Sequence, residues 1–326
     1  MGIKILGTGS YAPERILTNF DLEKIVDTSD EWIRTRTGIE ERKIAADNEC
    51  ASDMAAEASK NALDAAGLTA EDIDIIIVAT ISGDKPFPST ACFLQKKIRA
   101  ANSVCFDIQA ACSGFLFGLD IINSMMVANP RYKRALMVGV EKITYLTDWQ
   151  DRNTCVLFGD GAGAMVLEHR DDAGGVIASK IATDGNFTDI LDVPAGGSAR
   201  PIDEEVLKER SQYIRMEGQE VFKQAVTSMV GASKDVLDQA GVKASEIRWL
   251  IPHQAILRII KAVGKRLGLT EENVYINVNK YGNTSAASIP IAVDELVRAG
   301  KVERGEYLLL TAFGAGLTWG ASLIQW

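Results

Sequence analysis

Short apolar runs alternate with amphipathic stretches along most of the chain. The runs SVCFDIQ (103–109), RALMVGV (134–140) and EYLLLTA (306–312) have the length and composition of buried strands. Between such runs, apolar residues recur every three or four positions. This spacing predicts helices at 52–66, 112–128, 217–240, 255–267 and 285–300. The alternation is typical of α/β proteins, so we expect two mixed, largely parallel sheets covered by helices.

The chain also repeats itself. LDAAGLTAEDIDIII at 63–77 has a counterpart 174 positions later, LDQAGVKASEIRWLI at 237–251. Each segment predicts a helix end capped by glycine, then a polar loop and a buried strand. SVCFDIQAACSG and NVYINVNKYGNTSAAS match at nearly the same spacing. We therefore expect a duplicated α/β unit, with one half at 1–172 and the other at 173–326.

Composition narrows the class of protein. The 326 residues are 47% hydrophobic and 24% charged, as in a globular protein with a sizeable core. The net charge of −9 argues against a nucleic-acid partner, because phosphate binding needs a basic surface. Five cysteines without a CxxC pair favour neither a disulfide framework nor a metal site, so we expect a cytoplasmic protein.

One stretch could suggest a membrane span. Residues 307–326 carry no charge over 20 positions, which is long enough to cross a bilayer. FGAG lies in the middle of this stretch, however, and predicts a tight turn between two buried strands. The N-terminal MGIKILGTGSYAPE resembles a strand and a turn more than a signal peptide. We expect no membrane association.

Cys112 lies where a predicted strand ends and a predicted helix begins, in DIQAACSGFLFGLD. A buried cysteine can simply fill space in a core. At a helix N-terminus, however, unpaired N–H groups favour the thiolate, which is a nucleophile. The small residues around Cys112 would leave room for a substrate.

Two further polar residues occupy comparable positions. His253 follows the predicted strand WLIP, and Asn283 precedes the predicted helix at 285–300. Either residue could be a structural cap. Cysteine with histidine and asparagine, however, is one way to build an activated thiol site. If the halves pack about a pseudo-twofold axis, the helix starts at Cys112 and after Asn283 should face one shared site.

Two other patterns allow alternatives. The glycine-rich FGDGAGAMVL suggests a nucleotide-binding turn, but the residues after it are strand-like, so we interpret it as a turn between strands. The helix after His253 carries Arg258, Lys261, Lys265 and Arg266. This basic face is either a solvated helix surface or a docking surface for an acidic partner.

At these residues the sequence resembles the β-ketoacyl-[acyl-carrier-protein] synthase III family, the initiating condensing enzymes of type II fatty acid synthesis. The resemblance covers essentially the whole chain. The motifs that carry it are DEWIRTRTGIEER, AACSGF, FGDGAGA, PHQA, KYGNTSAASIP and GAGLTWG. It implies a thiolase-like fold, a duplicated five-layer αβαβα body, and a homodimer.

The resemblance also implies a reaction and its residues. Cys112 would take an acyl group from acyl-CoA, and the backbone N–H groups of Cys112 and Ala315 would bind the oxyanion. His253 and Asn283 would bind the thioester carbonyl of malonyl-[acyl-carrier protein] and stabilise the enolate formed as CO₂ leaves. No metal or organic cofactor is implied, because the CoA thioester is a substrate.

Further residues match the family's binding surfaces. Those for CoA are Thr28, Trp32, Arg36, Arg152 and Phe222, with Trp32 and Arg152 sandwiching the adenine. Those for docking the acidic carrier protein are Lys223, Arg258, Lys265 and Arg266. Phe87 matches a residue that borders the acyl pocket across the dimer.

Two positions depart from the family pattern. Ile256 stands where asparagine is usual after PHQA, and Ala315 stands where glycine is common. Both changes bear on the choice of primer, whose length and branching the sequence leaves open.

Related activities can be compared with the same motifs. A biosynthetic thiolase needs a second cysteine near the terminal turn, and a hydroxymethylglutaryl-CoA synthase needs a glutamate that has no match here. An acyltransferase that does not decarboxylate lacks the asparagine, and a non-catalytic carrier-protein-binding relative would have lost one of the three residues. A condensing enzyme of polyketide or quinolone synthesis keeps all three and stays open.

Overall fold

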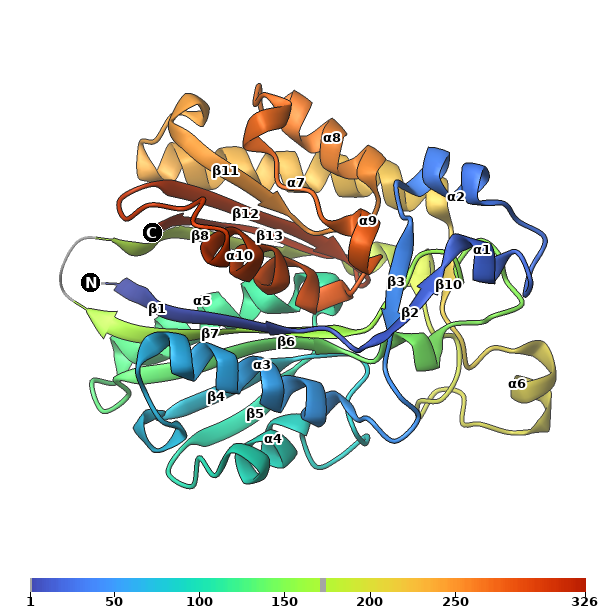
Figure 1. Ribbon diagram of the computed structural model, residues 1–326, viewed down its shortest axis with the longest axis horizontal. Coiled ribbons are helices and arrows are strands. Elements are labelled where there is room, and N and C mark those ends of the chain that lie inside the picture. Colours follow the sequence, from blue (N-terminus) through green and yellow to red (C-terminus); the bar gives the residue numbers. More distant parts are fainter. Residues whose placement is uncertain (1, 171–173) are drawn as a thin grey trace.

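The computed structural model of the protein describes residues 2–170 and 174–326, and Figure 1 shows it as five stacked layers of helices and sheets. The first sheet has the strand order β1-β7-β6-β4-β5, and the second has the order β11-β12-β13-β8. The strands of the first sheet are β1 (Gly2–Tyr11), β4 (Ile75–Ala79), β5 (Val104–Ile108), β6 (Arg134–Glu141) and β7 (Gly161–Arg170). Those of the second are β8 (Gly175–Thr183), β11 (Ile247–Pro252), β12 (Tyr307–Gly314) and β13 (Thr318–Gln325).

Six longer helices make the other three layers. The helices are α3 (Ala51–Ala66), α4 (Thr90–Ile98), α5 (Gly114–Ala128), α7 (Gly218–Ala240), α8 (Leu257–Arg266) and α10 (Ser288–Arg298). Helices α3 and α4 cover the outer face of the first sheet, and α7 and α8 cover the outer face of the second. Helices α5 and α10 lie between the sheets (Figure 1). These helices confirm the five predicted from periodicity, and the layers follow the expected αβαβα order (Figure 1).

The repeated segment has the predicted local structure in both halves. Helices α3 and α7 end at Gly67 and Gly241, and both glycines have φ = 66°. Each is followed by a 3₁₀ turn, η1 (Ala70–Asp72) or η5 (Ala244–Glu246), and then by β4 or β11. Glycine takes this left-handed conformation without the strain that a Cβ would add. The division into halves at 172/173 stays a prediction.

The expectation of largely parallel sheets is wrong in one respect. The sheets are mixed, as expected, but among the described residues the parallel strand pairs are β4–β5, β4–β6 and β11–β12. The pairs β1–β7, β6–β7, β12–β13 and β8–β13 are antiparallel. The reason is visible at β12 and β13, which are joined by three residues, whereas a parallel connection needs a crossover of a dozen or so residues.

The uncharged stretch at 307–326 forms the antiparallel pair β12 and β13, as predicted. Within the described residues, one helical segment, Ala111–Ala128, is long and apolar enough to cross a membrane by length and composition. This segment contains α5, which contacts strands of both sheets. Its buried side chains, among them Phe115, Leu119 and Ile122, belong to the core between the sheets.

The glycine-rich FGDGAGA is a strand start rather than the predicted turn, since Gly161–Ala164 open β7. A Cβ at Gly163 would lie 2.7 Å from the backbone N of Ile291 in α10. Glycine is needed because helix and sheet approach too closely for a side chain.

Residues 15–44 form a smaller unit beside the layers, with β2 (Arg15–Thr18), α1 (Asn19–Leu22), α2 (Asp30–Thr37) and β3 (Glu41–Ile44). The fully buried Arg42 ties this unit to the body. Its guanidinium donates to the carbonyls of Leu17 (3.1 Å) and Val156 (2.8 Å) and to Oδ1 of Asn19 (2.9 Å). This anchor fixes α2, which carries Trp32. The remaining short elements are β9 (Leu191–Asp192), β10 (Arg215–Met216), α6 (Glu204–Glu209), α9 (Val278–Tyr281), η3 (Ile143–Leu146), η4 (Gly185–Phe187) and η6 (Glu271–Asn273).

Candidate active site

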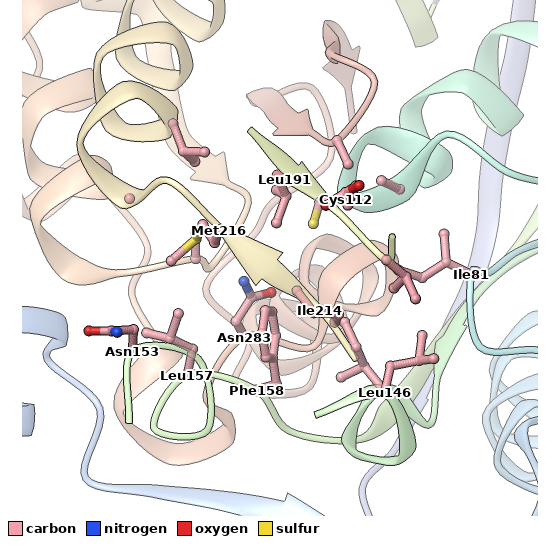
Figure 2. Close-up of a pocket in the computed structure, with 18 of the residues that line it drawn as sticks. Ile81, Cys112, Leu146, Asn153, Leu157, Phe158, Leu191, Ile214, Met216 and Asn283 are labelled. Carbon is pink, nitrogen blue, oxygen red and sulfur yellow. The ribbon is translucent and has the colours of Figure 1, made fainter. Parts of the chain in front are cut away.

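A cavity of about 1570 Å³ opens where the two halves meet, and Cys112, His253 and Asn283 all line it. The structure therefore brings together the three residues that the sequence placed at strand-to-helix junctions. Figure 2 shows the Cys112 sulfur and the Asn283 amide facing the same space. Apolar side chains form much of the surrounding wall, including Ile81, Leu146, Leu157, Phe158, Leu191, Ile214 and Met216.

Cys112 lies in the 3₁₀ turn η2 (Ala111–Ser113), between β5 and α5. The residue before it, Ala111, has φ = 45°, a left-handed conformation that side chains rarely adopt. Ser285 begins the 3₁₀ turn η7 (Ser285–Ala287) before α10, 174 positions later, and has φ = 48°. The two turns contact each other, so the predicted meeting of the two helix starts is confirmed.

Burial raises the pKa of the Cys112 thiol to about 12. The negative charge of Glu141 also raises this pKa, whereas a hydrogen bond with the Ser285 hydroxyl lowers it. Desolvation of the sulfur therefore opposes the preference for the thiolate that the helix N-terminus predicts. A base must take the thiol proton when Cys112 attacks.

His253 follows β11 and is held from two sides. Its backbone N–H donates to the Thr311 carbonyl (2.8 Å), and its ring Nδ1 lies 2.7 Å from Oγ of Ser288. The Ser288 oxygen already accepts a hydrogen bond from the backbone N–H of Gln254 (3.3 Å). We therefore assign the serine hydroxyl as the donor to Nδ1, which leaves the ring proton on Nε2.

The His253 ring is buried, and desolvation lowers its pKa to about 3. The imidazole is thus neutral near pH 7. With the proton on Nε2, the ring can donate one hydrogen bond without carrying a positive charge.

Asn283 lies between the short helix α9 and the turn η7. Its backbone is paired on both sides, because its N–H donates to the Leu157 carbonyl (2.8 Å) and its carbonyl accepts from the Gly159 N–H (3.1 Å). The side-chain Oδ1 accepts from the backbone N–H of Ser285 (2.9 Å). This bond settles the amide orientation, so Nδ2 is the group that can donate into the cavity.

The turn between β12 and β13 passes close to the nucleophile. A Cβ at Gly314 would lie 2.7 Å from the backbone N of Cys112, so only glycine fits there. Ala315 follows in the turn and lines the cavity. The backbones of Cys112 and Ala315 are therefore neighbours in the cavity wall.

Three of the five expected CoA residues line the cavity, and Thr28 and Arg152 do not. Trp32, Arg36 and Phe222 line it. The Arg36 and Arg152 guanidinium carbons lie 4.9 and 5.0 Å from the Trp32 ring centroid, so Arg152 stacks on the indole directly. Thr28 has a buried hydroxyl oxygen without a hydrogen-bond partner among the described residues.

The other expected binding residues divide into two groups. Arg258 lines the cavity and lies 5.5 Å from the Phe222 ring centroid, while Lys223, Lys265 and Arg266 are exposed on α7 and α8. Phe87 does not line the cavity of a single chain, and its side chain is 84% exposed.

Some residues around the site were not found from the sequence. Ser285 and Ser288 orient Asn283 and His253, and Glu141 lies buried beneath Ser285. The one signal for Glu141 was an acidic residue directly after the apolar run RALMVGV. No cluster of His, Cys, Asp or Glu within the described residues could hold a metal ion.

Comparison with known proteins gives one consistent result. Residues 106–185 match the family model "3-Oxoacyl-[acyl-carrier-protein (ACP)] synthase III", and residues 237–326 match the model of its C-terminal part. The chain is 53% identical to β-ketoacyl-[acyl-carrier-protein] synthase III of Caldanaerobacter subterraneus subsp. tengcongensis, over 99% of this chain and 97% of that protein. It is 52% identical to the protein of the same name from Desulfotalea psychrophila, over the full length of both.

Solved structures agree. The crystal structure of 3-oxoacyl-[acyl-carrier-protein] synthase III from Aquifex aeolicus is 49% identical, covers both chains fully and superposes with a TM-score of 0.92. The priming β-ketosynthase of the R1128 polyketide pathway is 34% identical, with a TM-score of 0.90 over 99% of this chain and 95% of that one.

Proposed function

Because the chain belongs to the β-ketoacyl-[acyl-carrier-protein] synthase III family, we propose that Cys112, His253 and Asn283 carry out its reaction. The enzyme is an acyltransferase that condenses an acyl primer with malonyl-[acyl-carrier protein] and so starts fatty acid synthesis. It needs no cofactor, since the acyl-CoA is itself a substrate. The single observation that supports the residue roles best is the convergence of all three side chains on one cavity.

In the first half-reaction, the Cys112 thiol gives its proton to a base as the sulfur attacks the carbonyl carbon of acyl-CoA. The electrons of the carbonyl move onto its oxygen, which the N–H groups of Cys112 and Ala315 stabilise. The tetrahedral intermediate then expels CoA and leaves an acyl group on Cys112. The closeness of Gly314 to the Cys112 backbone supports this assignment, because it brings the Ala315 turn beside the nucleophile.

In the second half-reaction, Nε2–H of His253 and Nδ2 of Asn283 donate to the thioester carbonyl of the malonyl group. Loss of CO₂ leaves an enolate whose oxygen stays between these two donors, and its carbon attacks the acyl-Cys112 carbonyl. Both groups can act as donors in this step, because Nε2 of His253 and Nδ2 of Asn283 each carry a hydrogen in their neutral forms. The pKa of about 3 for His253 supports a neutral ring throughout.

Two expectations about the substrates join this proposal. CoA would be bound by Thr28, Trp32, Arg36, Arg152 and Phe222. Its adenine would enter between Trp32 and Arg152. The exposed cations Lys223, Arg258, Lys265 and Arg266 would dock the acidic carrier protein beside the cavity mouth.

The state of the molecule in the cell is also part of the proposal. An exposed phenylalanine such as Phe87 is costly in water, which supports a homodimer in which a second copy covers it. Cysteines that are all free support a cytoplasmic location.

A specialised condensing enzyme of polyketide synthesis is the second candidate that the motifs left open. Identity to the curated fatty acid synthesis enzymes is 52–53%, against 34% to the R1128 ketosynthase. The comparisons therefore favour fatty acid initiation. Ile256 and Ala315 both line the cavity, so both can affect which primer binds. The experiment below therefore compares four primers.

The test is intact-protein mass after separate incubation with acetyl-, isobutyryl-, hexanoyl- and octanoyl-CoA, with Cys112→Ala as the control. An adduct of the acyl mass that is absent from Cys112→Ala supports the acyl-enzyme and ranks the primers. If wild type gains no mass with any of the four thioesters, Cys112 is not the acyl carrier for these primers and the proposal fails.

A further inference from the structure

Glu141 is a buried carboxyl group to which the condensation described above gives no role. It ends β6 and is fully buried, 144 positions away from its hydrogen-bond partner Ser285. No cation within the described part of the chain forms an ion pair with it. The neighbouring Lys142 ammonium is turned away, since it donates to the Ala46 and Glu49 carbonyls at 2.8 and 2.7 Å.

The hydrogen bonds to Glu141 are divided unequally between its two oxygens. Oε2 accepts from the Thr80 hydroxyl (3.2 Å), the Ile81 N–H (3.1 Å) and the Ser82 hydroxyl. The Thr80 and Ser82 oxygens each accept from a backbone N–H, so their own hydrogens are free for Glu141. Among the residues that the structure describes, Oε1 accepts from the Ser285 hydroxyl alone, at 2.9 Å. Oε1 is therefore the less stabilised oxygen and the better proton acceptor.

Ser285 connects this oxygen to the nucleophile. Its hydroxyl donates to Oε1 of Glu141, and the turn that contains Ser285 contacts the turn that contains Cys112. The hydroxyl has one hydrogen, which can go either to Glu141 or to the Cys112 sulfur, where a hydrogen bond lowers the pKa of the thiol. While it donates to Glu141, its lone pairs are free to accept the S–H proton. Ser285 thus lies between the Cys112 sulfur and the Glu141 carboxyl group.

We propose that Glu141, acting through Ser285, is the base that takes the Cys112 proton in acyl-enzyme formation and returns it when the product leaves. This inference rests on the proposed function, because it assumes that Cys112 carries the acyl group. Glu141 is a positioning residue here, since it reaches the sulfur only through Ser285.

The protons balance over one turnover. As Cys112 attacks, its S–H proton moves to Oγ of Ser285, and the Ser285 proton moves to Oε1 of Glu141. The departing CoA thiolate takes a proton from solvent. When the condensed product leaves, the S–C bond to Cys112 breaks, and the resulting thiolate recovers a proton from Ser285 while Glu141 returns one to Ser285. The cycle consumes one solvent proton, as the decarboxylative condensation requires.

The proton on Glu141 also removes the negative charge of its carboxylate during the condensation step. While Cys112 is acylated, the carboxyl group is neutral, so it does not oppose the enolate that forms nearby. Burial raises the pKa of Glu141 to about 7, which suits a group that must both take and return a proton near neutral pH. The titratable groups whose pKa the Glu141 charge raises are Cys112 and Tyr145.

The experiment compares the rate of acyl-Cys112 formation from acetyl-CoA between pH 5.5 and 9, by rapid quench and intact mass. In wild type we expect the rate to rise with pH and level off near pH 7. Glu141→Gln and Ser285→Ala should each be about 100-fold slower or more at pH 7.5, with a rate that keeps rising with pH. Because both remove the same relay, the double variant should be no slower than the slower single variant.

Asp160→Asn is the matched control. Asp160 is also fully buried and hydrogen-bonded, to Thr144 and to the Ala45 N–H, and it has no bond to Ser285. It should keep the wild-type pH profile even if it unfolds at a lower temperature. Alanine fits the left-handed position of Ser285, as Ala111 already takes that conformation, so Ser285→Ala carries the test if Glu141→Gln does not fold.

Two results would overturn the relay. One is a folded Glu141→Gln or Ser285→Ala protein with the wild-type rate and pH profile. The other is a double variant whose loss is the product of the two single losses. Absence of any adduct on wild-type Cys112 would instead overturn the proposed function, and it would be seen before any variant is compared.

Discussion

Nδ1 of His253 lies 2.7 Å from Oγ of Ser288, and this one contact decides which ring nitrogen faces the substrate. Ser288 is the first residue of α10, while His253 follows β11 on a different part of the chain. The packing of α10 between the sheets therefore sets the tautomer of a residue that α10 does not contain.

Ser288→Ala should slow decarboxylation of the malonyl group by about tenfold or more, because both His253 tautomers then become accessible. Formation of acyl-Cys112 should stay within about threefold of wild type. CO₂ release and intact mass measure the two steps separately. Ser59→Ala is the control, since Ser59 is a buried serine of α3 that bonds the Ala55 carbonyl. Equal losses in both steps would contradict a role through His253.

His253→Ala and Asn283→Ala should each retain acyl-Cys112 formation and lose decarboxylation by about 100-fold or more, as expected for loss of one donor to an oxyanion. The same two assays apply. If either variant blocked acylation and kept decarboxylation, the role assigned to that residue would be wrong.

Arg152→Ala should raise KM for acetyl-CoA by about threefold to thirtyfold, the range for loss of a cation–π partner. It should leave KM for acetyl-pantetheine, which has no nucleotide, unchanged. Arg304→Ala is the control, because Arg304 lies 4.9 Å from the Trp326 ring in a comparable contact. A similar rise for both substrates would place Arg152 outside the nucleotide site.

Lys265→Glu should raise KM for malonyl-[acyl-carrier protein] by about threefold to tenfold at low salt, with a smaller effect at high salt. Acylation by acetyl-CoA should not change. Lys96→Glu is the control, since Lys96 is exposed at the end of α4, in the opposite outer layer. Equal effects of Lys265→Glu and Lys96→Glu would mean that the carrier protein responds to net charge alone.

Glu141→Gln should change how stability depends on pH. The pKa of Glu141 is about 7 in the folded protein against 4.5 as the ordinary value, so the folded state binds the proton more tightly between these values. The stability that this gives is present below pH 4.5 and is lost as pH rises through 7. Glutamine has no such dependence, so the variant should gain at most about 3 kcal/mol relative to wild type between pH 4.5 and 8.

Urea unfolding of both proteins at pH 5 and pH 8 measures this gain. The contribution of His253 is common to the two proteins and cancels in the difference. An unfolding free-energy difference that is the same at both pH values would show that Glu141 does not titrate in this range.

Much of the architecture could be predicted from local pattern. The local sequence determines the spacing of apolar residues in the helices and the short apolar runs of the buried strands. It also places the glycine caps at Gly67 and Gly241. The three residues of the site were found because each stands at a strand-to-helix junction, and the duplication indicated that two of these junctions meet.

What the sequence missed depends on contacts between distant residues. Burial of the sulfur raises the pKa of Cys112, and this burial cannot be predicted from the position of Cys112 at a helix N-terminus. The left-handed backbone at Ala111 and Ser285 could not be predicted, because alanine and serine rarely adopt this conformation. The cavity wall at Leu191 and Ile214 comes from a segment with short elements and little periodicity.

The left-handed turns before Cys112 and at Ser285 have the same backbone form and different chemistry. The first turn carries the Cys112 sulfur, while the second carries the Ser285 hydroxyl that bonds the Glu141 carboxyl group. A substitution in one turn leaves the other unchanged, so each can be altered separately, and neither turn alone would hold a complete reaction centre.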